Sequence, residues 1–91
     1  MLTYKDCLEM CDFTKDEIKA IADHEHISGM AAILLAEELL HEKGGIFKIQ
    51  CMIMDDLEEA LEGHDCGRAG QLKEVLYHFI ESHPDALHLD R

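Results

Sequence analysis

Tryptophan is absent from this sequence, proline occurs once, at Pro84, and aromatic residues make up only 5% of the chain. β-Branched residues are also few, whereas Leu, Ala, Glu, Met and Lys are abundant, and this composition favours helices over strands. Because Pro84 stands near the C-terminal end, no proline interrupts a helix in the preceding residues. Hydrophobic residues account for 47% of the chain, which argues against disorder, and 91 residues leave room for one domain with one core.

Basic residues are scarce as well: 8 Lys and Arg stand against 20 Asp and Glu, and the formal net charge is −12. Such a charge repels phosphate backbones and anionic lipids, which argues against binding to nucleic acid or to a membrane surface. The longest apolar run extends only from Met30 to Ala36, whereas a bilayer span needs about 20 residues. The first residues lack a charged-then-apolar leader pattern. We therefore expect a soluble, cytoplasmic protein.

The sequence also lacks motifs that are typical of a particular catalysed reaction. The sequence has no glycine-rich phosphate loop and no serine in a nucleophile elbow. Its four cysteines lack the paired Cys-x-x-Cys spacing of a zinc ribbon, and in the reducing cytosol they are expected to be free thiols. Cys7 and Cys11 stand one helical turn apart, a spacing that suits core packing better than a copper or zinc site.

Helical spacing and end signals predict the secondary structure. Thr14 and Glu17 form a capping-box pattern, Ser28 is a favourable N-cap residue, and glycines or Pro84 follow the later segments. The predicted helices cover residues 2–11, 14–26, 28–43, 46–62 and 67–83. Since short joints make successive helices antiparallel neighbours, we expect an all-α fold. It would be a compact antiparallel bundle of four main helices plus a short N-terminal helix, in a single domain over residues 1–91 with a loose tail at 84–91.

The predicted helix over residues 28–43 is apolar around most of its circumference. This pattern is typical of a buried, central helix. Four neighbouring helices can only just cover such a surface in a chain of this length, so we also expect a homodimer or larger assembly.

Four polar side chains fall on predicted apolar faces: Glu25, Glu37, His41 and Asp56. A buried carboxylate must be paired, hydrogen-bonded, protonated or bound to a cation. One interpretation is that these residues lie at helix ends and reach water. The other is a transition-metal site, because imidazole and carboxylate together suit iron, manganese or zinc. The candidate ligands are Glu25, His26, Glu37, Glu38, His41 and Asp56.

The unit Glu38-Leu-Leu-His41 resembles half of the ferritin-like di-iron pattern, in which Glu-x-x-His places both ligands on one helix face. This resemblance implies metal ligation by Glu38 and His41 only, because the second unit of that family is missing. Straight antiparallel helices would also hold Glu25 and His26 about three turns from His41. The stretches HEH, MDDLEEA and VLYHFIESHP resemble small all-helical bacterial proteins, which implies a fold and no activity.

Two functions remain open on these grounds. The first is a small metal-binding helical protein. The second is a non-enzymatic interaction module, in which an acidic surface docks on a basic or apolar partner protein, since negative charge accelerates encounters with a basic partner. Neither hypothesis specifies a substrate, and the sequence does not decide whether the chain is an enzyme.

Overall fold

The computed structural model describes residues 2–84, which form five helices and no strand. They are α1 (Tyr4–Met10), α2 (Lys15–Glu25), α3 (Gly29–Leu40), α4 (Gly45–Glu62) and α5 (Cys66–Ser82). The all-helical prediction is confirmed, and the predicted ends agree with these bounds to within about three residues. Apart from Pro84, the predicted loose tail lies outside the described residues. Within residues 2–84, no helix combines the length and the apolar character that crossing a membrane would require.

Local hydrogen bonds set the helix starts. The capping box at α2 is confirmed: the Thr14 hydroxyl accepts from the Glu17 amide at 3.1 Å, and the Glu17 carboxylate accepts from the Thr14 amide at 2.9 Å. Ser28 caps α3 through the Ala31 amide at 3.2 Å. Each contact satisfies an amide that a helix start leaves unpaired, typically stabilising the helix by about 1 kcal/mol.

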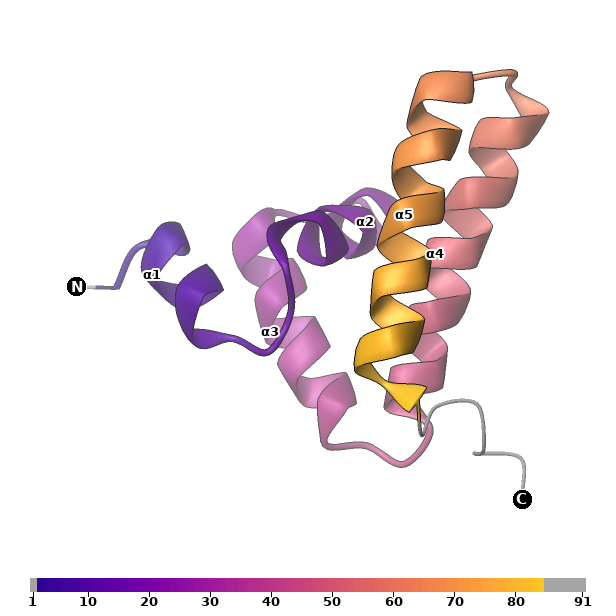
Figure 1. Cartoon of the computed structure of the whole chain (residues 1–91). Coiled ribbons are helices and arrows are strands. Elements are labelled where there is room, and N and C mark those ends of the chain that lie inside the picture. Colours follow the sequence, from indigo (N-terminus) through magenta and orange to yellow (C-terminus); the bar gives the residue numbers. More distant parts are fainter. Residues whose placement is uncertain (1, 85–91) are drawn as a thin grey trace.

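Figure 1 shows how the helices are arranged. α4 and α5 lie side by side as a long antiparallel hairpin, α2 runs across this hairpin, and α3 descends beside it. α1 packs against α3 at the edge of the molecule. The chain is therefore an assembly of packed helices in which α2 crosses its neighbours, and the regular antiparallel bundle is not confirmed.

The position of α3 differs from the expected central one. Leu34 is 69% exposed and Met30 is 38% exposed, so one face of α3 is open to solvent. α4 takes the central place instead, in contact with α2, α3 and α5. The physical reason is size: α1 is only 7 residues long and does not cover the outer face of α3. α3, which is apolar around most of its circumference, therefore remains partly exposed to solvent.

The core lies where α2, α3, α4 and α5 meet. Ile18, Ile21, Ile49, Ile53 and Phe79 are each 0% exposed. They come from the apolar faces that the sequence periodicity predicts for α2, α4 and α5. Burying a side chain of this size contributes about 1.5–3 kcal/mol, so this cluster fixes how the three helices sit against one another.

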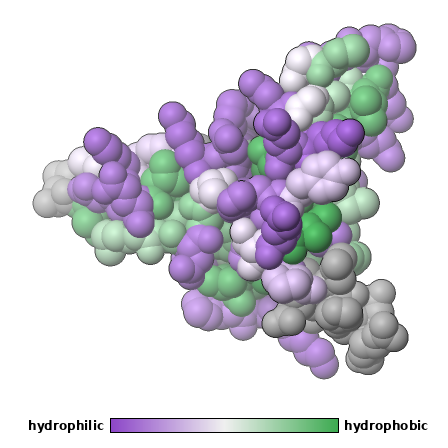
Figure 2. Space-filling view, in the orientation of Figure 1, coloured by the Kyte–Doolittle hydropathy of each residue, from purple (hydrophilic) through white to green (hydrophobic). Residues whose placement is uncertain are grey.

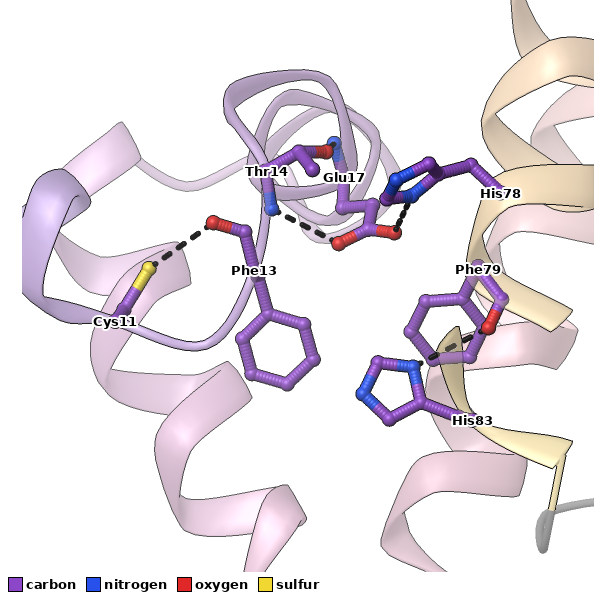
Figure 3. A network of polar contacts seen from close by, with 7 residues as sticks. All are labelled: Cys11, Phe13, Thr14, Glu17, His78, Phe79 and His83. Atoms are coloured by element: carbon purple, nitrogen blue, oxygen red, sulfur yellow. Dashed lines mark hydrogen bonds and ion pairs between the residues drawn. The ribbon is translucent and has the colours of Figure 1, made fainter. Parts of the chain in front are cut away.

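Glu17 is also buried, at 1% exposure, which the sequence pattern did not indicate. Figure 3 shows its carboxylate between the Thr14 amide and the His78 ring, whose Nδ1 lies 3.3 Å from Oε2. Nearby, the rings of Phe13 and Phe79 stack with centroids 6.4 Å apart. Together these contacts join the start of α2 to the end of α5.

The joint between α3 and α4 depends on two glycines. Gly44 has a φ of 78°, in the left-handed region that favours glycine. A Cβ on Gly45 would lie 1.7 Å from the carbonyl oxygen of Leu39, a distance that no side chain tolerates. The predicted turn at these residues is therefore confirmed, and Gly45 allows the backbones of α3 and α4 to approach closely.

Candidate functional site

Three helices meet around a pocket of about 370 Å³ that is lined by charged side chains. The end of α2 contributes Asp23, His24 and its C-cap residue His26, the second half of α4 contributes three carboxylates, and the first turn of α5 contributes a guanidinium. We call this the acidic pocket; its lining residues are Asp23, His24, His26, Asp55, Asp56, Glu59 and Arg68.

Helix ends place several of these side chains. His26 is the C-cap of α2 and adopts the left-handed conformation, with φ 57° and ψ 45°. This position usually takes glycine, because a Cβ there costs about 1 kcal/mol or more. Asp65 caps α5 by accepting from the Arg68 amide at 3.1 Å, which fixes Arg68 in the first turn. Both helix ends thus turn side chains toward the pocket.

His24 connects α2 to α4. Its Nδ1 lies 2.7 Å from Oε2 of Glu25, and its Nε2 lies 3.1 Å from Oδ2 of Asp55. Two carboxylates on the two ring nitrogens favour the doubly protonated ring, in which both nitrogens donate. Desolvation lowers the pKa of His24, but the hydrogen bonds that its ring donates to Glu25 and Asp55 and the nearby charge of Asp56 outweigh it, so the pKa is raised.

Asp23 pairs with both of its basic neighbours. Its Oδ2 accepts from Lys19 Nζ at 2.9 Å and from Arg68 Nη1 at 3.4 Å. Desolvation raises the pKa of Asp23, but these two cations outweigh it and hold the pKa below its usual value. The guanidinium of Arg68 is therefore already committed to a carboxylate within the pocket.

Asp56 is the unusual member. Its side chain is 7% exposed, and among the described residues nothing hydrogen-bonds to its Oδ2. Burial raises the pKa of Asp56, and the carboxylates of Asp23 and Glu59 add to this effect, while the charges of His24 and Arg68 oppose it only in part. A buried oxygen without a partner costs about 1–3 kcal/mol. Among the described residues, the pocket therefore contains a buried carboxylate oxygen that has no hydrogen-bond donor.

A larger groove of about 770 Å³ adjoins this pocket between α2 and α5, and both include Asp23 and Arg68. The groove is lined by charges of both signs, Lys15 and Lys19 among them. No buried side chain in its lining lacks a hydrogen-bond partner within residues 2–84. Of the two, the acidic pocket is the better candidate site, because its lining includes Asp56, whose buried Oδ2 has no hydrogen-bond partner among the described residues. The other buried atom without a partner there, Oε1 of Gln50, lines neither pocket.

The six predicted metal ligands separate into two groups. His26 and Asp56 line the acidic pocket, and Glu25 contacts it through His24. The other three, Glu37, Glu38 and His41, lie at the far end of α3 and do not line it. Glu37 accepts from the Asp12 amide at 3.3 Å, while Glu38 and His41 are exposed.

The sequence pattern missed other members of the pocket. His24, Asp55 and Glu59 were not among the candidate ligands that the sequence suggested. The spacing of Asp55 and Asp56 to Glu59 is a usable signal, because residues three and four apart are neighbours on the surface of a helix. The contact between this side of α4 and the end of α2 has no local signal.

Within residues 2–84, no three or more His, Cys, Asp and Glu side chains are grouped so that they could hold a metal ion. Comparison with protein-family models, with curated proteins and with solved structures gave no match for this chain. The likeness to the ferritin-like unit and to small bacterial helical proteins therefore stays a prediction.

Proposed function

We propose that this protein is a docking module that binds a basic, amphipathic helix of a partner protein along the outer face of α4. The observation that carries the proposal is a line of exposed apolar side chains. Phe47, Met54 and Leu61 are 39%, 46% and 59% exposed. They stand seven residues apart, which places them on one face of α4, as in the seam of a coiled coil. We call these three residues the α4 stripe.

Acidic side chains border the α4 stripe and define the partner's chemistry. Glu58 lies beside it on α4, four residues after Met54 and three before Leu61, and Glu62 follows one turn later on the same flank; both carboxylates are exposed. Figure 2 shows hydrophilic side chains over most of the visible face, with smaller hydrophobic patches between them. A partner helix with apolar residues two turns apart and Lys or Arg on the flanks is complementary both to the apolar side chains of the α4 stripe and to the acidic side chains beside it. A second copy of this chain is less suitable, since a net charge of −12 makes two such surfaces repel.

The predicted transition-metal function and the predicted homodimer remain open beside this proposal. Metal binding has less support, because the described residues offer no assembled group of ligands. Plasma spectrometry on protein purified without a histidine tag measures iron, manganese and zinc directly. Light scattering at high protein concentration measures the assembly state. A stoichiometric metal would favour the first prediction, and a dimer whose formation requires the α4 stripe would replace the partner helix by a second copy.

The docking proposal is tested with a short model peptide of leucine and lysine patterned as an amphipathic helix. Calorimetric titration should show binding that weakens several-fold between about 0.1 M and 0.5 M NaCl, because salt screens the charges at the rim. The double substitution Met54→Ser with Leu61→Ser should abolish binding. Leu34→Ser is the matched control, because Leu34 is 69% exposed on α3, away from the α4 stripe.

Two outcomes would overturn the docking proposal. One is peptide binding that the Met54→Ser and Leu61→Ser pair leaves unchanged. The other is equal loss of binding in the Leu34→Ser control, which would mean that any exposed apolar side chain suffices. A leucine and glutamate peptide of the same pattern should fail to bind, since it repeats the negative charge of the α4 border.

A further inference from the structure

We infer that the docked helix lies between α4 and α5, where Tyr77 of α5 is its second apolar contact beside the α4 stripe. The Tyr77 side chain is 61% exposed, so most of it is open to a partner. The inference rests on the proposed function and extends its site from one helix to two. It also narrows the chemistry of the partner, because the two helices border the site with different charges.

The α4 and α5 hairpin has one face toward α2, which contacts both helices. Side chains that line the two pockets beside α2 mark this face, among them Asp56 and Glu59 of α4 and Val75 of α5. Residues two positions apart in a helix point about 160° away from each other, to nearly opposite sides. Met54 stands two residues before Asp56, and Leu61 stands two residues after Glu59. The α4 stripe therefore lies on the face of the hairpin opposite α2.

Two side chains of α5 lie on the same face as the α4 stripe. Lys73 stands two residues before Val75 and Tyr77 two residues after it, and both are exposed. They are one turn apart and are therefore neighbours on the helix surface. Figure 1 shows α4 and α5 side by side in opposite directions, so the middle of α5 stands beside the middle of α4. The face opposite α2 thus presents an aromatic ring from α5 beside the apolar side chains of α4.

A position between two helices suits a partner helix better than the crest of one helix. On a single helix the partner meets only one row of side chains, whereas between two antiparallel helices it packs against both, as in a helical bundle. Tyrosine is among the residues that contribute most to binding at interfaces, because its large ring is buried at a small cost in conformational freedom. Tyr77 therefore adds a second anchor to the three side chains of the α4 stripe.

At the end of the hairpin where α4 ends and α5 starts, the two helices border this site with opposite charges. Glu58 and Glu62 lie on the α4 side, in the last turns of that helix. Lys73 lies on the α5 side, in the first half of that helix. Glu81, one turn after Tyr77, lies toward the other end of the hairpin. A partner helix with Lys or Arg on the flank toward α4, and with Asp or Glu opposite Lys73, is complementary to both borders.

Two model peptides test the charge pattern. One is the leucine and lysine peptide, with lysine on both flanks of its apolar face, and the other carries lysine on one flank and glutamate on the other. Calorimetric titration of the full-length protein should show tighter binding of the second peptide by about two- to fivefold, the effect of one exposed ion pair. Lys73→Glu should reverse this preference. Lys15→Glu is the matched control, because it changes the net charge equally but lies on α2, in the groove on the other face.

Substitution of Tyr77 tests the contact with the second helix. Tyr77→Ser should weaken binding of both peptides about fivefold or more, the effect of removing an interface anchor. Gln71→Ser is the matched control and should leave binding unchanged, because Gln71 is exposed on the same helix but lines the groove toward α2. Circular dichroism should show an unchanged helix content in both variants, since neither side chain is buried.

Loss of binding in different variants separates the two-helix site from docking on α4 alone. If Met54→Ser with Leu61→Ser abolishes binding and Tyr77→Ser leaves it unchanged, docking on α4 stands and the contact with α5 is refuted. Equal loss of binding in the Gln71→Ser control would also refute that contact. Peptides that bind equally, before and after Lys73→Glu, would refute the charge pattern. Failure of both peptides to bind would overturn the docking proposal together with this inference.

Discussion

Replacing Asp56 by asparagine should stabilise the fold at neutral pH, although most substitutions of buried residues destabilise a protein. The side chain is 7% exposed, and among the described residues its Oδ2 has no hydrogen-bond partner. Leaving such a group unsatisfied costs about 1–3 kcal/mol. Asparagine keeps the shape and removes the charge, but it still buries a polar atom. We therefore expect the free energy of unfolding to rise by about 1 kcal/mol, the lower end of this range.

The stability gained by Asp56→Asn should depend on pH, because the cost of burying Asp56 applies only to its charged form. Burial raises the pKa of Asp56 in the folded protein. A carboxyl group with a raised folded-state pKa contributes stability at low pH, and this contribution is lost as the pH rises through the folded-state pKa. The parent protein carries the cost of the buried charge above that pKa, and Asp56→Asn does not. The gain should be largest at neutral pH and should vanish below about pH 4, where the carboxyl is protonated in both states.

Urea denaturation followed by circular dichroism measures this effect. At about pH 7 the unfolding midpoint of Asp56→Asn should move to a higher urea concentration, while the dependence of the unfolding free energy on urea concentration stays unchanged. The melting temperature should rise by about 4–8 °C for each kcal/mol gained. Asp55→Asn is the matched control, because Asp55 is 67% exposed and accepts from His24, so its loss should cost no more than about 0.5 kcal/mol. If Asp56→Asn destabilises the protein near pH 7, or if its gain persists below about pH 4, then Asp56 is a satisfied structural carboxylate and the acidic pocket contains no destabilising buried charge.

Three further predictions concern the same helices. His26→Gly should raise the free energy of unfolding by about 0.5–1 kcal/mol in thermal melts, since the left-handed cap favours glycine; no gain would mean that the His26 side chain stabilises the cap. Gly45→Ala should cost about 2–3 kcal/mol or more, because its Cβ would meet the Leu39 carbonyl, and urea denaturation showing a near-native stability would contradict this reading of the joint. The raised pKa of His24 implies stability that is complete below about pH 6.5 and lost as the pH rises through the folded-state pKa. The pKa of His24 from its ring-proton NMR titration should lie above that of a free histidine, and a lowered pKa would refute the double ion pair. Below about pH 6.5 the parent protein should exceed His24→Gln in free energy of unfolding by about 0.5–1 kcal/mol, and this difference should shrink as the pH rises.

The sequence alone determined the helices and most of their ends. Capping by Thr14 and Ser28, and the turn at Gly44 and Gly45, involve atoms within a few residues of one another, so the pattern of residue types is sufficient. The periodicity of apolar residues also indicated most of the buried faces of α2, α4 and α5, but Glu25, which it placed on the apolar face of α2, is exposed at the end of that helix. It indicated Asp56 as a polar residue at the edge of such a face, and in this way found the most informative residue of the candidate site.

Only the tertiary structure decided which polar groups meet. His24 and Asp55 are 31 residues apart, Asp23 and Arg68 are 45 apart, and Glu17 and His78 are 61 apart. Such contacts depend on the angle at which α2 crosses the α4 and α5 hairpin, and core packing sets this angle. The same packing left an apolar face of α3 in solvent and buried Asp56, whose Oδ2 has no hydrogen-bond partner within residues 2–84. Burial and charge pairing are properties of the assembled helices, because each depends on what the neighbouring helix brings to within a few ångströms.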